Sequence, residues 1–109
     1  MDEQQLQQTQ ALIARDFELE QTEETMTEED LFRLLADQIA YMIEHKMEFL
    51  LSLMYRLDIS EAKVDAALSP ACPEPANIAL ARLVLERQKQ RIRTKQEYKQ
   101  DELEEGWEI

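Results

Sequence analysis

The residues best suited to chemistry in this sequence are a run of bases near the C-terminus. Residues 82–99 contain seven lysines and arginines and two glutamates, in a chain whose formal net charge is -12. Arg87, Arg91 and Lys95 recur every four residues and so share one face of a helix. Such a face can bind carboxylates or phosphates through charge-assisted hydrogen bonds. The predicted interaction surface consists of these bases with one tail residue: Arg87, Lys89, Arg91, Arg93, Lys95 and Trp107.

Three kinds of partner could neutralise these bases. The chain carries its own acids, five in residues 101–109 and ten in residues 1–30. Because the acidic tail is tethered beside the bases at high effective concentration, pairing within the chain or between its copies is the favoured prediction. An acidic protein is the second candidate. Nucleic acid is the third, through counterion release, but the field of an acidic protein repels it and Tyr98 is the only aromatic residue in the basic run.

Catalytic chemistry has little support in the sequence. Nucleophilic catalysis needs a nucleophile, a base and an orienting group within reach of one another. The single cysteine, Cys72, lies in a proline-rich loop and the single histidine, His45, in a predicted helix, with nothing local to bring them together. Gly106 is the only glycine, which excludes a glycine-rich phosphate loop. We therefore predict no catalytic residue, no bound cofactor and no enzymatic activity.

Glu44, His45 and Glu48 come nearest to a metal-ligand cluster. Helical di-iron sites use a Glu-x-x-His motif on each of two helices, with further glutamates. The residue three positions before His45 is Met42, and the sequence has no second copy of the motif. We interpret these residues as part of a solvated polar stripe and predict no metal ligand.

Two other features could serve recognition. Trp107, in the acidic tail with Ile109, could fill a pocket on another protein or pack on the chain's own helices, and the sequence leaves both alternatives open. Methionine and aromatic residues between positions 41 and 55 could form an adaptable groove. Residues at helical spacing in an apolar helix are more often core, which is the favoured interpretation here.

The elements that must position these residues are helices. One glycine and three prolines provide too few turns for a sheet, and leucine, alanine, glutamate and glutamine favour helix. Thr27 before a run of acids is typical of a helix start, as is Ser60 or Asp58 before Glu61. We predict an all-α protein: a small bundle of three to four helices, over about 3–20, 28–56, 60–68 and 76–99, completed by self-association.

The predicted helix 28–56 is the main reason to expect a dimer. Apolar residues cover most of its circumference, so it needs cover on two or three sides. A monomer in which the other helices wrap it fully is the alternative. The rest of the chain divides around this centre into an acidic, Gln- and Glu-rich, weakly helical arm (1–26), a helical domain (27–100) and an acidic disordered tail (101–109).

Signals for secretion or membrane insertion are missing from the sequence. The first residues lack the basic and apolar regions of a signal peptide, and charges interrupt every apolar stretch before membrane-spanning length. A lone cysteine fits a reducing compartment. We expect a cytoplasmic protein without a membrane partner.

One stretch of the chain is similar to a known group of proteins. The segment Tyr55-Arg56-Leu57-Asp58-Ile59-Ser60-Glu61, with Glu86-Arg87-Gln88 and the basic ending downstream, resembles a family of short uncharacterised bacterial all-helical proteins over residues 30–95. The family carries no assigned activity. The resemblance therefore supports the helix boundaries and implies no functional residue.

The function predicted from the sequence is protein–protein interaction or assembly. We expect a homodimer whose acidic and basic helices pair with each other or with an acidic protein partner. The alternative is a nucleic-acid-associated regulator that binds through the basic helix 82–99.

Overall fold

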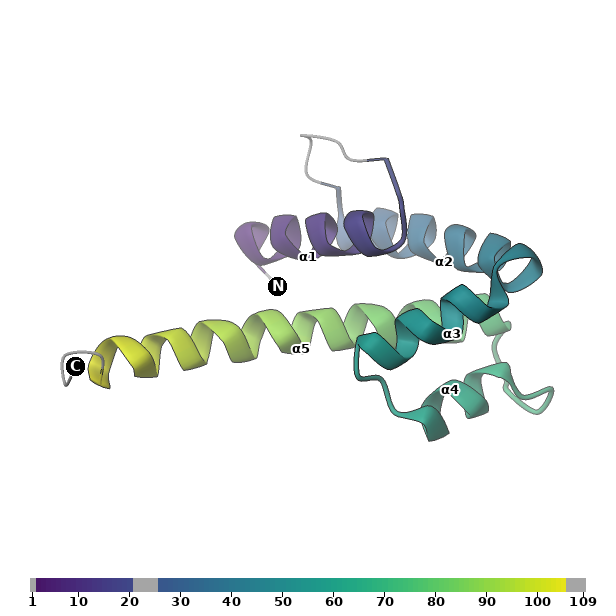
Figure 1. The fold of residues 1–109 in the computed structure, drawn as a ribbon. Coiled ribbons are helices and arrows are strands. Elements are labelled where there is room, and N and C mark those ends of the chain that lie inside the picture. The colour runs from purple at the N-terminus through teal and green to yellow at the C-terminus, as the bar shows by residue number, and fades with distance from the viewer. Residues whose placement is uncertain (1, 21–25, 106–109) are drawn as a thin grey trace.

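The computed structural model describes residues 2–20 and 26–105, and the side chains of all of these up to residue 94. This part of the chain contains five helices and no strand: α1 (Glu3–Asp16), α2 (Glu28–His45), α3 (Met47–Arg56), α4 (Glu61–Leu68) and α5 (Ala76–Glu105). Figure 1 shows their arrangement. The predicted all-α class is confirmed, but the chain forms five helices where three to four were predicted. None of the helices described combines the length and apolar character needed to cross a lipid bilayer.

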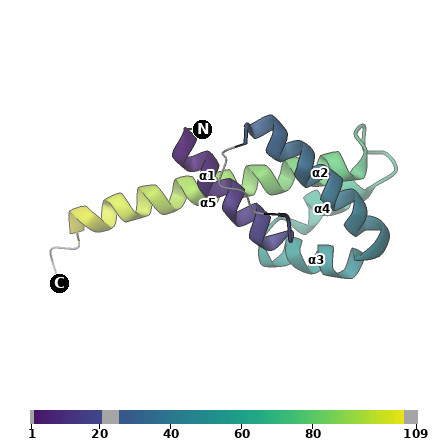
Figure 2. The same ribbon diagram turned by 90° about the horizontal axis from the view of Figure 1, so that it is seen from above.

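Helix α5 is the central element of the fold. Helices α1, α2 and α4 all pack against it, and α3 turns back from the end of α2 (Figures 1 and 2). Its buried residues Ala81, Leu85 and Ile92 recur at helical spacing, whereas Ile78, at the same spacing, is only half-buried. The other helices contribute apolar residues to the same core, among them Ile13, Phe17, Leu31, Leu35, Ile39, Leu50, Leu53 and Val64.

The long helix predicted over 28–56 is wrong, because the chain breaks it at Lys46. This residue has φ -141° and ψ 45°, outside the helical region, and it ends α2 and begins α3. One helix of that span would be about 43 Å long and would carry residues 47–56 past the end of the core. The break lets α3 fold back and bury Leu50, Leu53 and Met54. Much of this apolar surface is thus covered within one chain, whereas five large side chains on the two helices stay exposed: Leu34, Tyr41, Phe49, Leu51 and Tyr55.

The helix starts follow the local sequence closely. Thr27 accepts a hydrogen bond of 3.0 Å from the backbone N–H of Asp30, which confirms it as the N-cap of α2. Asp2 and Gln5 form a reciprocal capping box at the start of α1. Ser60 is the N-cap residue of α4, so this helix begins one residue after the predicted position.

Two helices end on a residue in the left-handed region although neither residue is glycine. Glu18 (φ 57°) follows α1 and Asp58 (φ 61°) follows α3. In each case the next N–H reaches back to the helix, from Leu19 to the carbonyl of Ala14 and from Ile59 to that of Met54. Both are Schellman endings, which glycine normally occupies because a Cβ is unfavourable there.

Helix α5 extends beyond the core against which the other helices pack. Ile92 is the last buried residue among the side chains described, and the helix continues to Glu105, six residues beyond the predicted end. Both ribbon views show this end projecting past α1 (Figures 1 and 2). Residues 101–105, assigned to the predicted tail, are therefore helical, while the division into arm, domain and tail stays a prediction.

Candidate interaction surface on helix α5

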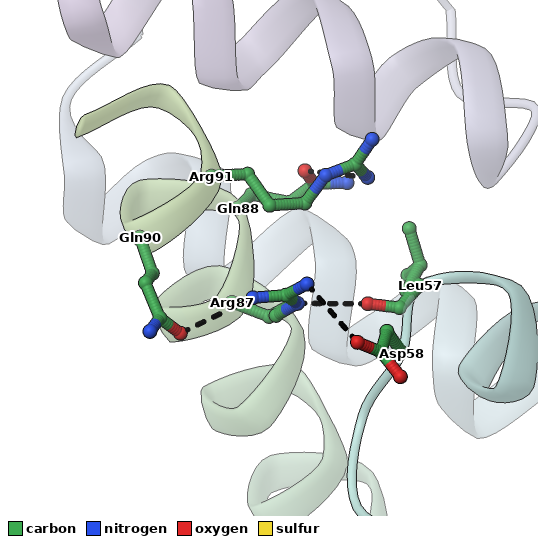
Figure 3. A network of polar contacts seen from close by, with 6 residues as sticks. All are labelled: Leu57, Asp58, Arg87, Gln88, Gln90 and Arg91. Carbon is green, nitrogen blue, oxygen red and sulfur yellow. Dashed lines mark hydrogen bonds and ion pairs between the residues drawn. The ribbon is translucent and has the colours of Figure 1, made fainter. Parts of the chain in front are cut away.

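Arg87, a predicted surface residue, turns inward and holds the end of α3. Its Nε donates a hydrogen bond of 2.9 Å to the carbonyl oxygen of Leu57, the C-cap residue of α3. Its Nη2 lies 3.5 Å from a carboxylate oxygen of Asp58, and its Nη1 lies 3.3 Å from Oε1 of Gln90 (Figure 3). Carbonyls at a helix C-terminus have no partner within the helix. Arg87 supplies one from α5, and only 27% of its side chain stays exposed.

Lys89 is also drawn into the fold. Its ammonium forms an ion pair with Glu28 in the first turn of α2, and it lies 3.7 Å from Glu86 on its own helix. Its side chain is 21% exposed. An acid from the first thirty residues therefore neutralises this base, as the prediction of pairing within the chain requires.

Gln88 connects α5 to the end of α1. The residue is fully buried, its Nε2 lies 3.5 Å from a carboxylate oxygen of Asp16, and its Oε1 lies 3.4 Å from Nη1 of Arg91. Figure 3 shows Gln88 and Arg91 side by side on α5. Both hydrogen bonds are long, so each contributes weakly.

Arg82, at the start of the basic run, has a structural role as well. Its Nη2 lies 3.1 Å from a carboxylate oxygen of Glu74, in the loop before α5. Its guanidinium also lies 5.5 Å from the centre of the Phe32 ring on α2, within the range of a cation–π contact.

The bases that remain outward lie at the projecting end of the helix. Arg91 and Arg93 are exposed, and Arg93 has no ion-pair partner among the side chains described. Lys95 lies on the backbone of α5, but its side chain is outside the described residues, and Trp107 is outside them altogether. The predicted surface is thus divided: Arg87 and Lys89 hold the fold together, and the outward surface begins at Arg91.

A polar cavity of about 390 Å³ lies beside this surface, where the start of α4 meets α5. Lys63, Arg87 and Arg93 line it together with Asp58 and Glu86. Lys63 comes from α4 and was not predicted as a site residue, since nothing in its local sequence points toward α5. Because acids share the lining with the bases, the cavity does not concentrate one sign of charge.

The Met and aromatic residues between positions 41 and 55 divide between core and surface. Met42 and Met54 are buried in the core, which supports the favoured interpretation for them. Tyr41, Phe49 and Tyr55 are exposed, and Tyr55 most of all at 86%. The Arg56 guanidinium lies 5.9 Å from the ring centre of Phe49.

His45 and Cys72 lie in unrelated surroundings. The imidazole contacts the ring of Tyr41, with centroids 4.7 Å apart, and its Nε2 lies 3.6 Å from a carboxylate oxygen of Glu44. Cys72 is half-buried and lines a separate cavity of about 510 Å³ between α4 and the start of α5. Within the part of the chain that the structure describes, no three potential ligand residues gather to hold a metal ion.

Sequence-based reasoning missed several polar residues that join the helices. Gln38 Nε2 donates to the carbonyl of Phe17 at the end of α1 (3.0 Å), and Asn77 Nδ2 donates to that of Ala36 on α2 (3.2 Å). Their partners lie 21 and 41 residues away in the chain. Only contacts distant in sequence reveal these roles, so no local pattern could have identified them.

Comparison with protein-family models, curated proteins and solved structures finds no match for this chain. Its function must therefore be argued from its own surfaces. Among these, the end of α5 that leaves the core is the most distinctive.

Proposed function

We propose that this protein is a small helical assembly protein that acts as a homodimer through the projecting end of α5. The observation that carries the proposal is the continuation of α5 to Glu105, well beyond Ile92, the last buried residue among the side chains described. A helix that leaves its domain loses the packing that usually stabilises helices. A partner would restore it.

The charge pattern of this end supports a partner. Residues 91–105 contain five pairs of charged residues at i, i+4 spacing, and Arg93–Glu97 is the only pair of opposite charge. The like-charged pairs are Arg91–Lys95, Lys95–Lys99, Glu97–Asp101 and Asp101–Glu105. Each such pair destabilises an isolated helix by about 0.2–0.5 kcal/mol. The acids at the C-terminal end also meet the negative end of the helix dipole, which is unfavourable.

Two acids that contact the basic run already pair with its inner bases. Glu28 already pairs with Lys89, and Asp58 lies beside Arg87. Both ribbon views show α5 running on beyond α1, with no other described helix alongside (Figures 1 and 2). A second molecule would bring a further source of opposite charge to this end.

Sedimentation equilibrium of the full chain tests the proposal. We expect a monomer–dimer equilibrium at micromolar to submillimolar concentration in low salt, which shifts toward monomer as salt screens the charges. A monomer over the whole range, with no protein partner in a pull-down, would overturn the proposal.

Nucleic-acid binding is the second candidate, favoured by the exposure of Arg91 and Arg93. Under this alternative the full chain would be retained on heparin or RNA at low salt, and R91Q/R93Q would reduce the salt needed for elution. Under the assembly proposal we expect no retention, because the acidic majority of the chain repels phosphate.

A further inference from the structure

We infer that the projecting ends of two α5 helices pair antiparallel about a two-fold axis at Tyr98, so that the bases of each copy face the acids of the other. This inference rests on the proposed homodimer and adds to it the partner segment, the orientation and the register. The partner that packs against the projecting end of α5 is the same helix of a second copy.

The order of charge along the helix is the first observation. Residues 91–99 carry four bases and one acid, and residues 101–105 carry four acids and no base. Because both groups lie on one continuous helix, they cannot fold against each other within a chain. Their midpoints, residues 95 and 103, are separated by about 12 Å at 1.5 Å per residue. That separation exceeds the Debye length of about 10 Å at 0.1 M salt, so neutralisation within the helix is confined to the boundary, where Lys99 and Glu102 lie at i, i+3 spacing.

The charge order selects the orientation of the pair. Two parallel helices in register would set bases against bases and acids against acids. Two antiparallel helices set the basic half of each against the acidic half of the other, twice in every dimer. Charge complementarity of this kind determines orientation and excludes the alternative.

The residue spacing selects the register. Arg91, Lys95, Tyr98, Glu102 and Glu105 follow one another at intervals of four, three, four and three, which places them along one stripe of the helix. Arg91 and Glu105 lie seven residues before and after Tyr98. An axis at Tyr98 therefore brings position 91 of one copy level with position 105 of the other, and position 95 level with position 101.

Tyr98 suits a position on the axis because it is the only aromatic residue among positions 93–105. Aromatic side chains contribute large contact areas at interfaces, and a tyrosine hydroxyl can form a hydrogen bond at the edge of the contact. The helix ends also have room to approach, since both ribbon views show α5 extending clear of the bundle (Figures 1 and 2). About four turns of helix form a small interface, so we expect a weak, salt-sensitive dimer.

Disulfide trapping in the full chain tests the register. In a Cys72→Ser background, Y98C is expected to give disulfide-linked dimers under mild oxidation, because the axis brings the two copies of position 98 together. R91C alone and E105C alone should stay unlinked, whereas a mixture of the two variants should form a mixed disulfide. The C72S chain without an added cysteine is the control.

The outcomes separate this inference from the proposed function. Efficient linking of R91C to itself and of E105C to itself would indicate parallel helices and overturn the inference. A dimer in sedimentation that no cysteine pair traps would leave the homodimer proposal standing and also overturn the inference. A full-length chain that stays monomeric would overturn both.

Discussion

Arg87 on α5 caps the end of α3 by donating from Nε to the carbonyl oxygen of Leu57, thirty residues earlier, at 2.9 Å. One residue of the predicted interaction surface is thus occupied by the chain's own backbone. The contact fixes α3 and the start of α4 against the central helix. Because it removes Arg87 from the outward basic surface, that surface begins at Arg91.

Replacing Arg87 should destabilise the fold. We expect R87A to lower the free energy of unfolding by about 1.5–3 kcal/mol, because a charged donor is lost and the Leu57 carbonyl is left without its partner. R87K should recover part of this loss, since an ammonium lacks the planar fork that reaches Leu57 and Asp58 together. Urea denaturation followed by circular dichroism measures both.

The matched control for Arg87 is Asp58. Its side chain is 91% exposed, so its ion pair with Arg87 lies in solvent and contributes little. D58N keeps a residue that tolerates the left-handed conformation and removes the charge. If D58N proved as destabilising as R87A, the ion pair and not the helix cap would be the important contact.

Gln88 offers a second test of the α5 contacts. Because its two hydrogen bonds are 3.4 and 3.5 Å long, we expect Q88M, which keeps the volume, to change the free energy of unfolding by less than about 1 kcal/mol. Q88A should cost about 2 kcal/mol, since it also leaves a cavity. Equal losses in the two variants would mean that the polar link between Asp16 and Arg91 is the larger contribution.

At the left-handed position of Glu18, glycine should be more favourable than alanine. We expect E18G to be more stable than E18A by about 1 kcal/mol, because glycine has no Cβ to oppose a φ of 57°. Both variants lose the exposed ion pair with Lys46, so their difference isolates the backbone effect. Thermal unfolding of the pair measures it, and equal stability would contradict the assignment of a Schellman ending.

Charge reversal should control assembly. R91E/R93E/K95E and D101K/E102K/E105K are each expected to sediment as monomers, since each makes the projecting end carry mainly one sign of charge. An equimolar mixture of the two should form heterodimers. The control R15E/R33E/K63E changes the net charge as much as the first variant, at exposed positions on other helices, and should leave the dimer intact. A first variant that dimerises as well as this control would contradict the role of α5.

Local sequence predicted the helix starts better than the helix ends. Thr27 caps α2 where expected, because an N-cap depends on a side chain and the next few backbone groups. Ser60 takes the expected N-cap position of α4 without a side-chain hydrogen bond. The break at Lys46 was missed, since residues 39–56 contain neither glycine nor proline. The break is instead associated with the packing of α3 against the core, a contact that local sequence does not reveal. Helix α5 also ends later than predicted, at Glu105 and not at residue 99.

The sequence by itself determined the helical class, the periodic core positions and the separation of acidic from basic charge, all of which depend on residue types at short spacing. Only the tertiary structure decided which bases stay outward. Arg87 and Lys89 contact Leu57 and Glu28, residues 30 and 61 positions away, so no local pattern could assign them. Because these two are occupied inside the fold and α5 extends past Ile92, Arg91 and Arg93 are the bases of the predicted surface that stay outward among the side chains described.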